Sequence, residues 1–252
     1  MPYSLKGRNV LVTGGSRGLG AVICAKFAAE GSNVMINYVS SKDKAEEVAG
    51  KCEKDFGVKV AIVQGDVGVA ADCVRLVKET VQHLGGLDII VNNAGWTRFA
   101  KFDDLNDLSH EEWDKCWRTN VMSQLCLMQE AVPIFNANTE GGVFLVCSSI
   151  AGISCAGSSL GYSVTKASAL HLMKCMASTQ GPKIRINAIL PGLLLTDWGM
   201  RYTADRIQQT IEAAALKHET YLDDCADSFI STAKNTSITG QQIVVDAGVV
   251  IR

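Results

Sequence analysis

The feature that most constrains this chain is a run of glycines directly behind a short apolar segment near the N-terminus. Residues 9–13 are followed by Gly14-Gly15-Ser16-Arg17-Gly18-Leu19-Gly20 and then by the apolar, helix-forming segment 21–27. A strand, a tight turn and a helix start explain this order, because glycines let the backbone turn sharply and approach a ligand closely. Free N–H groups and the helix dipole attract phosphate there. The turn predicts a phosphate site, and the alternative is a tight connection that holds no ligand.

The rest of the chain repeats this alternation of short apolar segments and longer segments of helical period. Val- and Ile-rich segments predict seven strands, near residues 9–13, 33–38, 59–64, 88–92, 143–147, 185–190 and 242–246. Helices are predicted near 18–30, 42–56, 70–83, 109–135, 162–179 and, more loosely, 204–233. This alternation is typical of α/β proteins in which crossover helices cover both faces of a parallel sheet. No linker or repeat divides the chain, so we expect one doubly wound domain over residues 1–252.

Composition excludes several classes of function. The 24 Lys and Arg against 26 Asp and Glu give a net charge of −2, and the basic residues are scattered, so no nucleic-acid partner is expected. No apolar run approaches the roughly 20 residues that cross a bilayer, so no membrane partner is expected either. Residues 1–8 precede no apolar segment of the secretory type.

The cysteines and histidines predict a reduced protein without a metal. Nine cysteines form an odd set with no Cys-x-x-Cys pair, and most lie within apolar segments. The four histidines lie at no ligand spacing from a cysteine, which leaves a zinc site without support. We therefore expect a cytoplasmic protein without disulfides.

The end of the second predicted strand bears on cofactor choice. Dinucleotide sites without a phosphate on the adenosine ribose usually place an Asp or Glu there. Here the strand runs into Asn37-Tyr38-Val39-Ser40-Ser41-Lys42, with no acid before Asp43. The missing carboxylate removes a repulsion against a 2′-phosphate, and Arg17 with Ser40, Ser41 or Lys42 could bind one directly. The sequence favours NADP(H), with solvated surface charges as the alternative explanation of Arg17 and Lys42.

A tyrosine and a lysine four residues apart are the candidate catalytic pair. Tyr162 and Lys166 begin a predicted helix, so both side chains lie on one face. A phenol with a pKa of about 10 is a poor acid or base at neutral pH, and a fixed ammonium nearby favours its phenolate. The pair alone is also compatible with a core aromatic beside a surface charge.

The complete set of spaced motifs resembles one family. The set comprises Thr13-Gly14-x-x-x-Gly18-x-Gly20, Asp66-Val67, Asn92-Asn93-Ala94-Gly95, Asn120, Ser149, Tyr162-x-x-x-Lys166 and Pro191-Gly192-x-x-x-Thr196. This order and spacing resemble the short-chain dehydrogenase/reductase family over nearly the whole chain. The resemblance implies a single-domain Rossmann fold with a seven-stranded sheet, and a substrate loop with small helices within residues 193–237.

The resemblance also implies catalytic roles. Ser149 would hydrogen-bond the substrate carbonyl oxygen, and Tyr162 would protonate that oxygen while hydride leaves the nicotinamide. Lys166 would lower the pKa of Tyr162 and bind the nicotinamide ribose, and Asn120 would position a water that feeds protons to it. The alternative for the serine is that Ser148 faces the site.

Cofactor binding is implied for three regions besides the glycine turn. Asp66 and Val67 would meet the adenine, Asn93 and Gly95 would flank the adenosine-side ribose, and Leu194 and Thr196 would hold the carboxamide. The complete expected set is Gly14, Ser16, Arg17, Gly18, Leu19, Gly20, Asn37, Tyr38, Ser40, Ser41, Asp66, Val67, Asn93, Ala94, Gly95, Tyr162, Lys166, Pro191, Gly192, Leu194 and Thr196. The alternatives are that Asn92 and Asn93 chiefly bond neighbouring strands, and that Asp66 caps the next helix.

Within the family, the sequence of residues 36–48 looks like that of NADPH-dependent ketoreductases, such as 3-oxoacyl-acyl-carrier-protein reductases and fungal polyhydroxynaphthalene reductases. Two segments depart from the family's usual sequence and put an acyl-carrier substrate in doubt: residues 218–224, and Asp246-Ala247-Gly248 near the end. An apolar substrate pocket could involve Trp96, Phe99, Ile150, Ser154, Leu193 and Trp198, although each could equally pack in the core.

The sequence therefore predicts an NADP(H)-dependent oxidoreductase acting on a small-molecule carbonyl or alcohol. By resemblance it would form a homodimer or homotetramer. Two alternatives stay open: an NADP(H)-binding sensor or scaffold without turnover, and a dehydratase or cyclase on the same fold.

Overall fold

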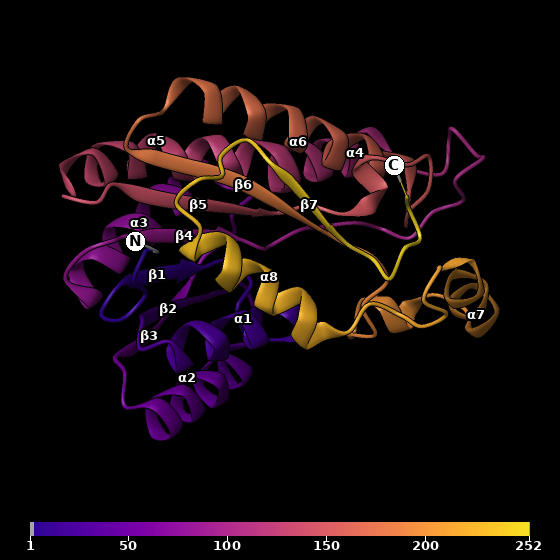
Figure 1. The fold of residues 1–252 in the computed structure, drawn as a ribbon. Coiled ribbons are helices and arrows are strands. Elements are labelled where there is room, and N and C mark those ends of the chain that lie inside the picture. Colours follow the sequence, from indigo (N-terminus) through magenta and orange to yellow (C-terminus); the bar gives the residue numbers. More distant parts are fainter. Residues whose placement is uncertain (1–2, 252) are drawn as a thin grey trace.

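Seven parallel strands form one sheet at the centre of the molecule (Figure 1). The computed structural model describes residues 3–251. The strands are β1 (Asn9–Val12), β2 (Asn33–Tyr38), β3 (Val60–Gln64), β4 (Ile89–Asn92), β5 (Gly142–Cys147), β6 (Ile184–Pro191) and β7 (Gln242–Val245). Their spatial order is β3-β2-β1-β4-β5-β6-β7, so the direction of winding reverses between β1 and β4. Ligands of such sheets bind outside the carboxyl ends of the strands at this reversal.

Helices cover both faces of the sheet (Figure 1). One face packs against α1 (Gly18–Ala29), α2 (Lys42–Phe56) and α8 (Leu222–Lys234), and the other against α3 (Ala70–Leu84), α5 (Ser123–Ala137) and α6 (Leu160–Thr179). Alternate residues of each strand enter opposite cores: Val10 and Val12 face the first layer, and Leu11 faces the second. The predicted single doubly wound α/β domain is confirmed.

The helix predicted over residues 109–135 is in fact three pieces. These are α4 (His110–Trp117), a π-helical turn (Arg118–Met122) and α5. Ser109 caps α4 with a reciprocal capping box to Glu112. The π turn covers only five residues, which are too few for an apolar pattern to reveal a separate period. Asn120 lies within this turn.

Between β6 and β7 the chain leaves the two layers. A short 3-10 helix (Gly199–Arg201) and α7 (Ala204–Ala213) precede α8. Figure 1 shows α7 standing beyond the carboxyl end of the sheet, apart from both helical layers. The amphipathic α7 buries none of its residues fully. Because α7 stands apart from both layers, it can form one wall of a cavity at the carboxyl end of the sheet.

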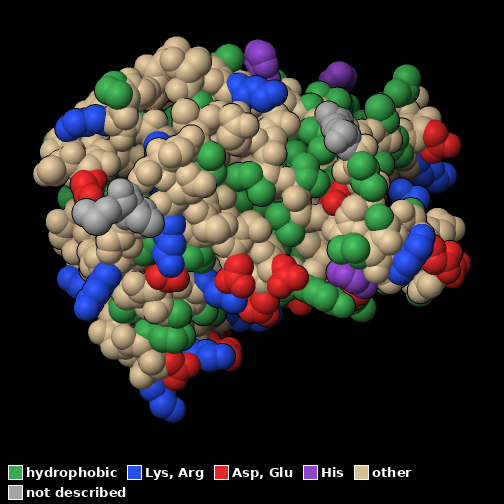
Figure 2. Space-filling model, in the orientation of Figure 1, with side chains coloured by type: hydrophobic (Ala, Val, Ile, Leu, Met, Phe, Trp, Pro, Cys, Tyr) green, Lys and Arg blue, Asp and Glu red, His purple; other side chains and the backbone are tan. Residues whose placement is uncertain are grey.

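The surface and the sulfur chemistry agree with an ordinary globular domain. Figure 2 shows basic and acidic side chains interspersed on the face drawn. None of the helices in residues 3–251 combines the length and the apolar character that a bilayer crossing requires. All nine cysteines are free thiols, of which Cys155 and Cys175 are exposed.

Candidate active site

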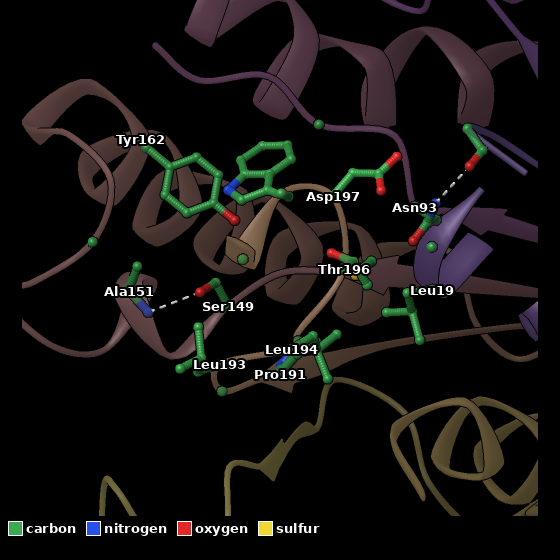
Figure 3. Close-up of a pocket in the computed structure, with 18 of the residues that line it drawn as sticks. Leu19, Asn93, Ser149, Ala151, Tyr162, Pro191, Leu193, Leu194, Thr196 and Asp197 are labelled. Carbon is green, nitrogen blue, oxygen red and sulfur yellow. Dashed lines mark hydrogen bonds between the residues drawn. The ribbon is translucent and has the colours of Figure 1, made fainter. Parts of the chain in front are cut away.

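A cavity of about 620 Å³ lies at the carboxyl end of the sheet, between the strands and α7. The loops after β1, β2, β4, β5 and β6 all contribute to its walls. Figure 3 shows Tyr162, Ser149 and Ala151 at one end, Leu19 and Asn93 at the other, and Leu194, Thr196 and Asp197 between them. The site therefore joins residues from across the whole chain at the place where the winding of the sheet reverses.

The glycine turn forms one end of the cavity. Gly14 and Gly18 have φ angles of +62° and +54°, which L side chains rarely adopt. A Cβ added at Gly20 would lie 2.3 Å from the carbonyl oxygen of Gly14, so only a glycine lets α1 begin so close to β1. The backbone N–H of Gly14 donates to Oδ1 of Asn37 at 3.1 Å. The turn is a shallow cradle at a helix N-terminus, as the spacing predicts.

Basic side chains around this end differ in whether they are already paired. Arg17 is exposed on the cavity wall and makes no salt bridge to any carboxylate of residues 3–251. Lys42 lies at the start of α2, where its Nζ pairs with Glu46 at 3.3 Å. Asp43 occupies the first turn of α2, as expected for an acid at a helix start. Arg17 is thus the cation most available to a bound anion at this end.

Asn93 holds the glycine turn against β4. Its Nδ2 donates to the carbonyl oxygens of Thr13 at 3.0 Å and Gly14 at 3.2 Å, and the hydroxyl of Thr13 accepts from the backbone of Asn93 and Ala94. Asn92 bonds Thr13 and Ser123 in the same way. Both asparagines bond neighbouring elements, and Asn93 also lines the cavity.

Tyr162 and Lys166 lie side by side in the first turns of α6. Ser159 caps this helix by accepting a hydrogen bond from the backbone N–H of Tyr162 at 3.1 Å. The Nζ of Lys166 lies 5.4 Å from the centre of the Tyr162 ring and donates to the carbonyl oxygen of Cys147 at 2.8 Å. The ring of Trp198 lies against Tyr162, with 5.6 Å between the ring centres. The expected pair is therefore formed on one helix face and is fixed by packing on both sides.

Burial shifts the pKa values of this pair in opposite directions. It raises the pKa of Tyr162 well above the usual phenol range, with a smaller rise from Cys147, and a hydrogen bond with Ser149 works in the opposite direction. Burial also lowers the pKa of Lys166. We expected the lysine to lower the pKa of Tyr162, but in the protein alone desolvation outweighs any such effect. Both groups favour their neutral forms more than they do in water.

Two adjacent serines follow β5, and their side chains have different hydrogen-bond partners. The hydroxyl of Ser148 is buried and donates to the backbone carbonyl of Lys166 at 3.4 Å. Ser149 lies at the start of a short 3-10 helix (Ile150–Gly152), where its Oγ accepts from the backbone of Ala151 at 3.1 Å. Both residues line the cavity, but Ser149 is the one that influences Tyr162.

Most of the expected cofactor residues lie on the cavity wall. These are Gly14, Ser16, Arg17, Gly18, Leu19, Gly20, Tyr38, Ser40, Ser41, Asn93, Ala94, Gly95, Tyr162, Lys166, Pro191, Gly192, Leu194 and Thr196. Four expected site residues, Asn37, Asp66, Val67 and Asn120, are not brought to this wall. The Asp66 carboxylate accepts from the backbone N–H of Gly68, which closes the turn before α3.

Asn120 lies behind the wall and supports it. Its Oδ1 accepts from the backbone N–H of Trp96 at 2.8 Å, and its Nδ2 donates to the carbonyl of Trp96 and to the hydroxyl of Thr165, both at 3.0 Å. The π turn aims this side chain at the loop after β4. Asn120 thereby joins Trp96, the neighbour of Gly95 on the cavity wall, to the helix that carries Tyr162 and Lys166.

Sequence patterns missed part of the wall. Ile150, Ser154, Leu193 and Trp198 line the cavity as considered, whereas Trp96 and Phe99 do not. Residues not anticipated include Cys147, Asp197, Tyr202, Arg206, Ile207, Thr210, Val249 and Val250. The amphipathic pattern of α7 was the available signal for Arg206, Ile207 and Thr210, because a helix with one apolar face needs a partner surface.

The residues that line the cavity suit a dinucleotide. A Cβ at Gly14 would lie 3.2 Å from the Cα of Ala94, and one at Gly20 would lie 2.3 Å from the carbonyl oxygen of Gly14, so the cradle forms only with glycines at these positions. A Cβ at Gly95 would lie 3.6 Å from the Nζ of Lys166. The cavity runs unbroken from this cradle to Tyr162, which is the elongated space a dinucleotide needs. Within residues 3–251, no cluster of three or more His, Cys, Asp or Glu side chains could hold a metal ion.

Comparison with known proteins gives a consistent result. The family model described as short chain dehydrogenase matches residues 8–207. A granaticin polyketide synthase putative ketoacyl reductase 2 from Streptomyces violaceoruber is 34% identical over 94% of both chains. A 3-oxoacyl-[acyl-carrier-protein] reductase from Staphylococcus epidermidis is 33% identical over 96% of this chain and 98% of its own. A short chain dehydrogenase from Burkholderia cenocepacia, solved in complex with NADP, superimposes with a TM-score of 0.90 at 29% identity, covering 98% of this chain and 99% of the other.

Proposed function

Because the chain belongs to the short chain dehydrogenase family, we propose that it is an NADPH-dependent oxidoreductase that reduces a carbonyl group to an alcohol, or runs the reverse reaction. The observation that carries this proposal is the meeting of Tyr162, Lys166 and Ser149 at one end of a cavity whose other end is a glycine cradle. A sensor, a scaffold or a dehydratase would not need this combination of a phenol acid and a dinucleotide cradle.

In the proposed mechanism the protein binds the carbonyl oxygen and supplies its proton. Ser149 donates a hydrogen bond to the oxygen, which polarises the carbonyl and places it beside the Tyr162 hydroxyl. Tyr162 is neutral and therefore carries the proton that the developing alkoxide takes. When bound, NADPH supplies the hydride. Lys166 stabilises the phenolate that remains, since its ammonium is held on the same side by the Cys147 carbonyl.

The choice of NADPH follows from the charges at the cradle. Arg17 is an available cation, Ser40 and Ser41 offer hydroxyl donors, and no carboxylate lies at the end of β2. The Burkholderia cenocepacia neighbour was solved with NADP, which supports the same choice.

Two further parts of the proposal concern the setting of the enzyme. The similarity to relatives named ketoacyl reductases supports a ketone or ketoacyl substrate, although residues 218–224 differ from the family's usual sequence. Residues 193–237 form the substrate segment, because Leu193, Trp198 and Tyr202 face the catalytic end of the cavity. We keep a cytoplasmic homodimer or homotetramer as part of the proposal.

The test is NADPH oxidation with a panel of ketones, compared between the wild type and Tyr162→Phe. Removing the general acid lowers kcat by about 10²-fold to 10⁴-fold, while NADPH still binds in a fluorescence titration. Tyr221→Phe is the matched control, because Tyr221 is 50% exposed and stacks on His218 instead of lining the cavity. A Tyr162→Phe variant that keeps its kcat overturns the proposal.

A further inference from the structure

The end of the cavity opposite the glycine cradle carries a cation that the carbonyl chemistry does not use. Arg206 lies in the first turns of α7, is exposed and lines the cavity. It makes no salt bridge to any carboxylate within residues 3–251. Asp197, the one carboxylate among the cavity-lining residues described, is held 3.6 Å from the Nζ of Lys44. Arg206 is therefore free to bind an anion in the cavity.

A tyrosine is built into the wall next to this cation. Tyr202 follows the 3-10 helix, and its ring packs edge-on against Phe99 with 4.8 Å between ring centres. Its hydroxyl lies near Ser158, whose Oγ donates to the Thr97 hydroxyl at 2.9 Å. Burial raises the pKa of Tyr202, and the nearby Arg206 guanidinium works in the opposite direction. A fixed, neutral phenol thus lies beside an unpaired guanidinium.

This polar pair stands between the catalytic residues and the outside. Tyr202 is near enough to Tyr162 to contribute to the rise of its pKa. Apolar side chains line the cavity around this pair, among them Leu193, Trp198 and Ile207. A molecule whose carbonyl lies at Ser149 and Tyr162 would lay an apolar body along Trp198 and carry its far end to Arg206. The planar fork of an arginine matches a carboxylate in particular.

We propose that the substrate is a keto acid: an apolar, ring-containing body with the reacting carbonyl at one end and a carboxylate at the other, which Arg206 binds with help from the Tyr202 hydroxyl. This inference rests on the proposed function, because it assumes that the carbonyl reacts at Tyr162. It assigns Arg206 and Tyr202 as residues that set substrate specificity.

The test compares each of two keto acids, 4-acetylbenzoate and 6-acetyl-2-naphthoate, with its neutral methyl ester. In the wild type we expect the acid of at least one pair to have the higher kcat/KM, through a lower KM. Arg206→Met keeps the aliphatic stem and removes the charge, so the preference for the acid falls about tenfold. Tyr202→Phe keeps the ring against Phe99 and lowers the preference about two- to tenfold. Arg201→Met is the control, since Arg201 stacks on Phe99 at 4.4 Å outside the cavity wall.

A binding measurement separates this inference from the proposed function. Tyr162→Phe, saturated with NADPH, is titrated with each acid and ester, and binding is followed by quenching of tryptophan fluorescence. Tighter binding of an acid that is lost in Tyr162→Phe/Arg206→Met supports the inference even if neither compound turns over. Equal binding of acid and ester in both pairs, or a preference that survives Arg206→Met, overturns it. A wild type that turns over none of these compounds, with the binding preference intact, would count only against the proposed function.

Discussion

At the scale of single residues, the site is shaped by what burial does to Tyr162 and Lys166. The raised pKa of the phenol keeps Tyr162 protonated, so this group adds stability below the ordinary phenol pKa and loses it as the pH rises further. The lowered pKa of the amine means that the unfolded chain binds the proton of Lys166 more tightly than the folded protein does. Holding this ammonium inside the protein therefore costs stability at neutral pH.

We predict that Lys166→Met is more stable than the wild type at about pH 7 in the absence of cofactor, although it loses activity. Methionine fills similar space without a charge to desolvate. The wild type gains stability as the pH rises toward 10.5, the ordinary pKa of lysine, because the unfolded chain is then the form that still holds the proton. Urea unfolding between about pH 7 and about pH 9.5 should show the advantage of the variant shrinking. A growing advantage would contradict the sign of the shift.

Arg17 gives a second prediction, on cofactor choice. Arg17→Ala should lower the ratio of kcat/KM for NADPH to that for NADH by about tenfold or more, because it removes a charge-assisted hydrogen bond to the 2′-phosphate. Lys42→Ala serves as the matched control, since Lys42 already pairs with Glu46 and should therefore contribute less to binding a phosphate. Equal effects of the two substitutions would mean that general positive charge, rather than Arg17 itself, reads the phosphate.

At the scale of elements, the glycine turn shows how closely β1 and α1 must approach. A Cβ at Gly20 would lie 2.3 Å from the carbonyl oxygen of Gly14 and 2.6 Å from the side-chain nitrogen of Asn93. Gly20→Ala must therefore push the helix away from the strand, and we expect a loss of about 1–3 kcal/mol in the free energy of unfolding together with weaker NADPH binding.

Gly50→Ala is the matched control for that prediction. Gly50 lies inside α2, and a Cβ there meets nothing within 4 Å. Alanine favours a helix interior over glycine, so this variant should gain about 0.5–1 kcal/mol. Urea unfolding of both variants is the measurement. If Gly20→Ala were as stable as Gly50→Ala, the turn would have room for a Cβ at residue 20, and the prediction would be wrong.

Strands and most helices could be predicted from the sequence because their patterns are local. The apolar segments 33–38 and 60–64 and the helical period of residues 42–56 depend on neighbours in the chain. The π turn at Arg118–Met122 could not be predicted, since its five residues are too few to show a period of their own. Its effect on Asn120 is large, because it aims this side chain at Trp96.

The residues that line the cavity are likewise of two kinds: some could be predicted from local sequence patterns and others could not. The glycine turn and the Tyr162–Lys166 pair are spaced motifs, and the structure brings both to the cavity wall. Tyr202, Arg206 and Val250 reach the wall only because the chain after β6 folds back over the carboxyl end of the sheet. No motif spacing in the sequence predicts that these three residues reach the cavity wall, so their position could be found only from the tertiary structure.

At the scale of the whole molecule, one sheet supports two cores. Residues of β1 alternate between them, and Cys24 and Cys225 lie in the core under α1 and α8, whereas Cys73 lies in the core under α3. Neither helical layer can leave without uncovering one face of every strand it packs on. The two layers should therefore unfold together, as a single cooperative unit.

The thiols make this cooperativity measurable. Cys155 and Cys175 are exposed and should react quickly with iodoacetamide in the native protein. Burial raises the pKa of Cys24, of Cys225 and, to about 12, of Cys73, so these three are neither accessible nor ionised in the folded state. We expect all three to be labelled with the same dependence on urea, because each needs the same global opening. Labelling of Cys225 at lower urea than Cys73, resolved by mass spectrometry, would instead mean that the layer containing α8 opens on its own.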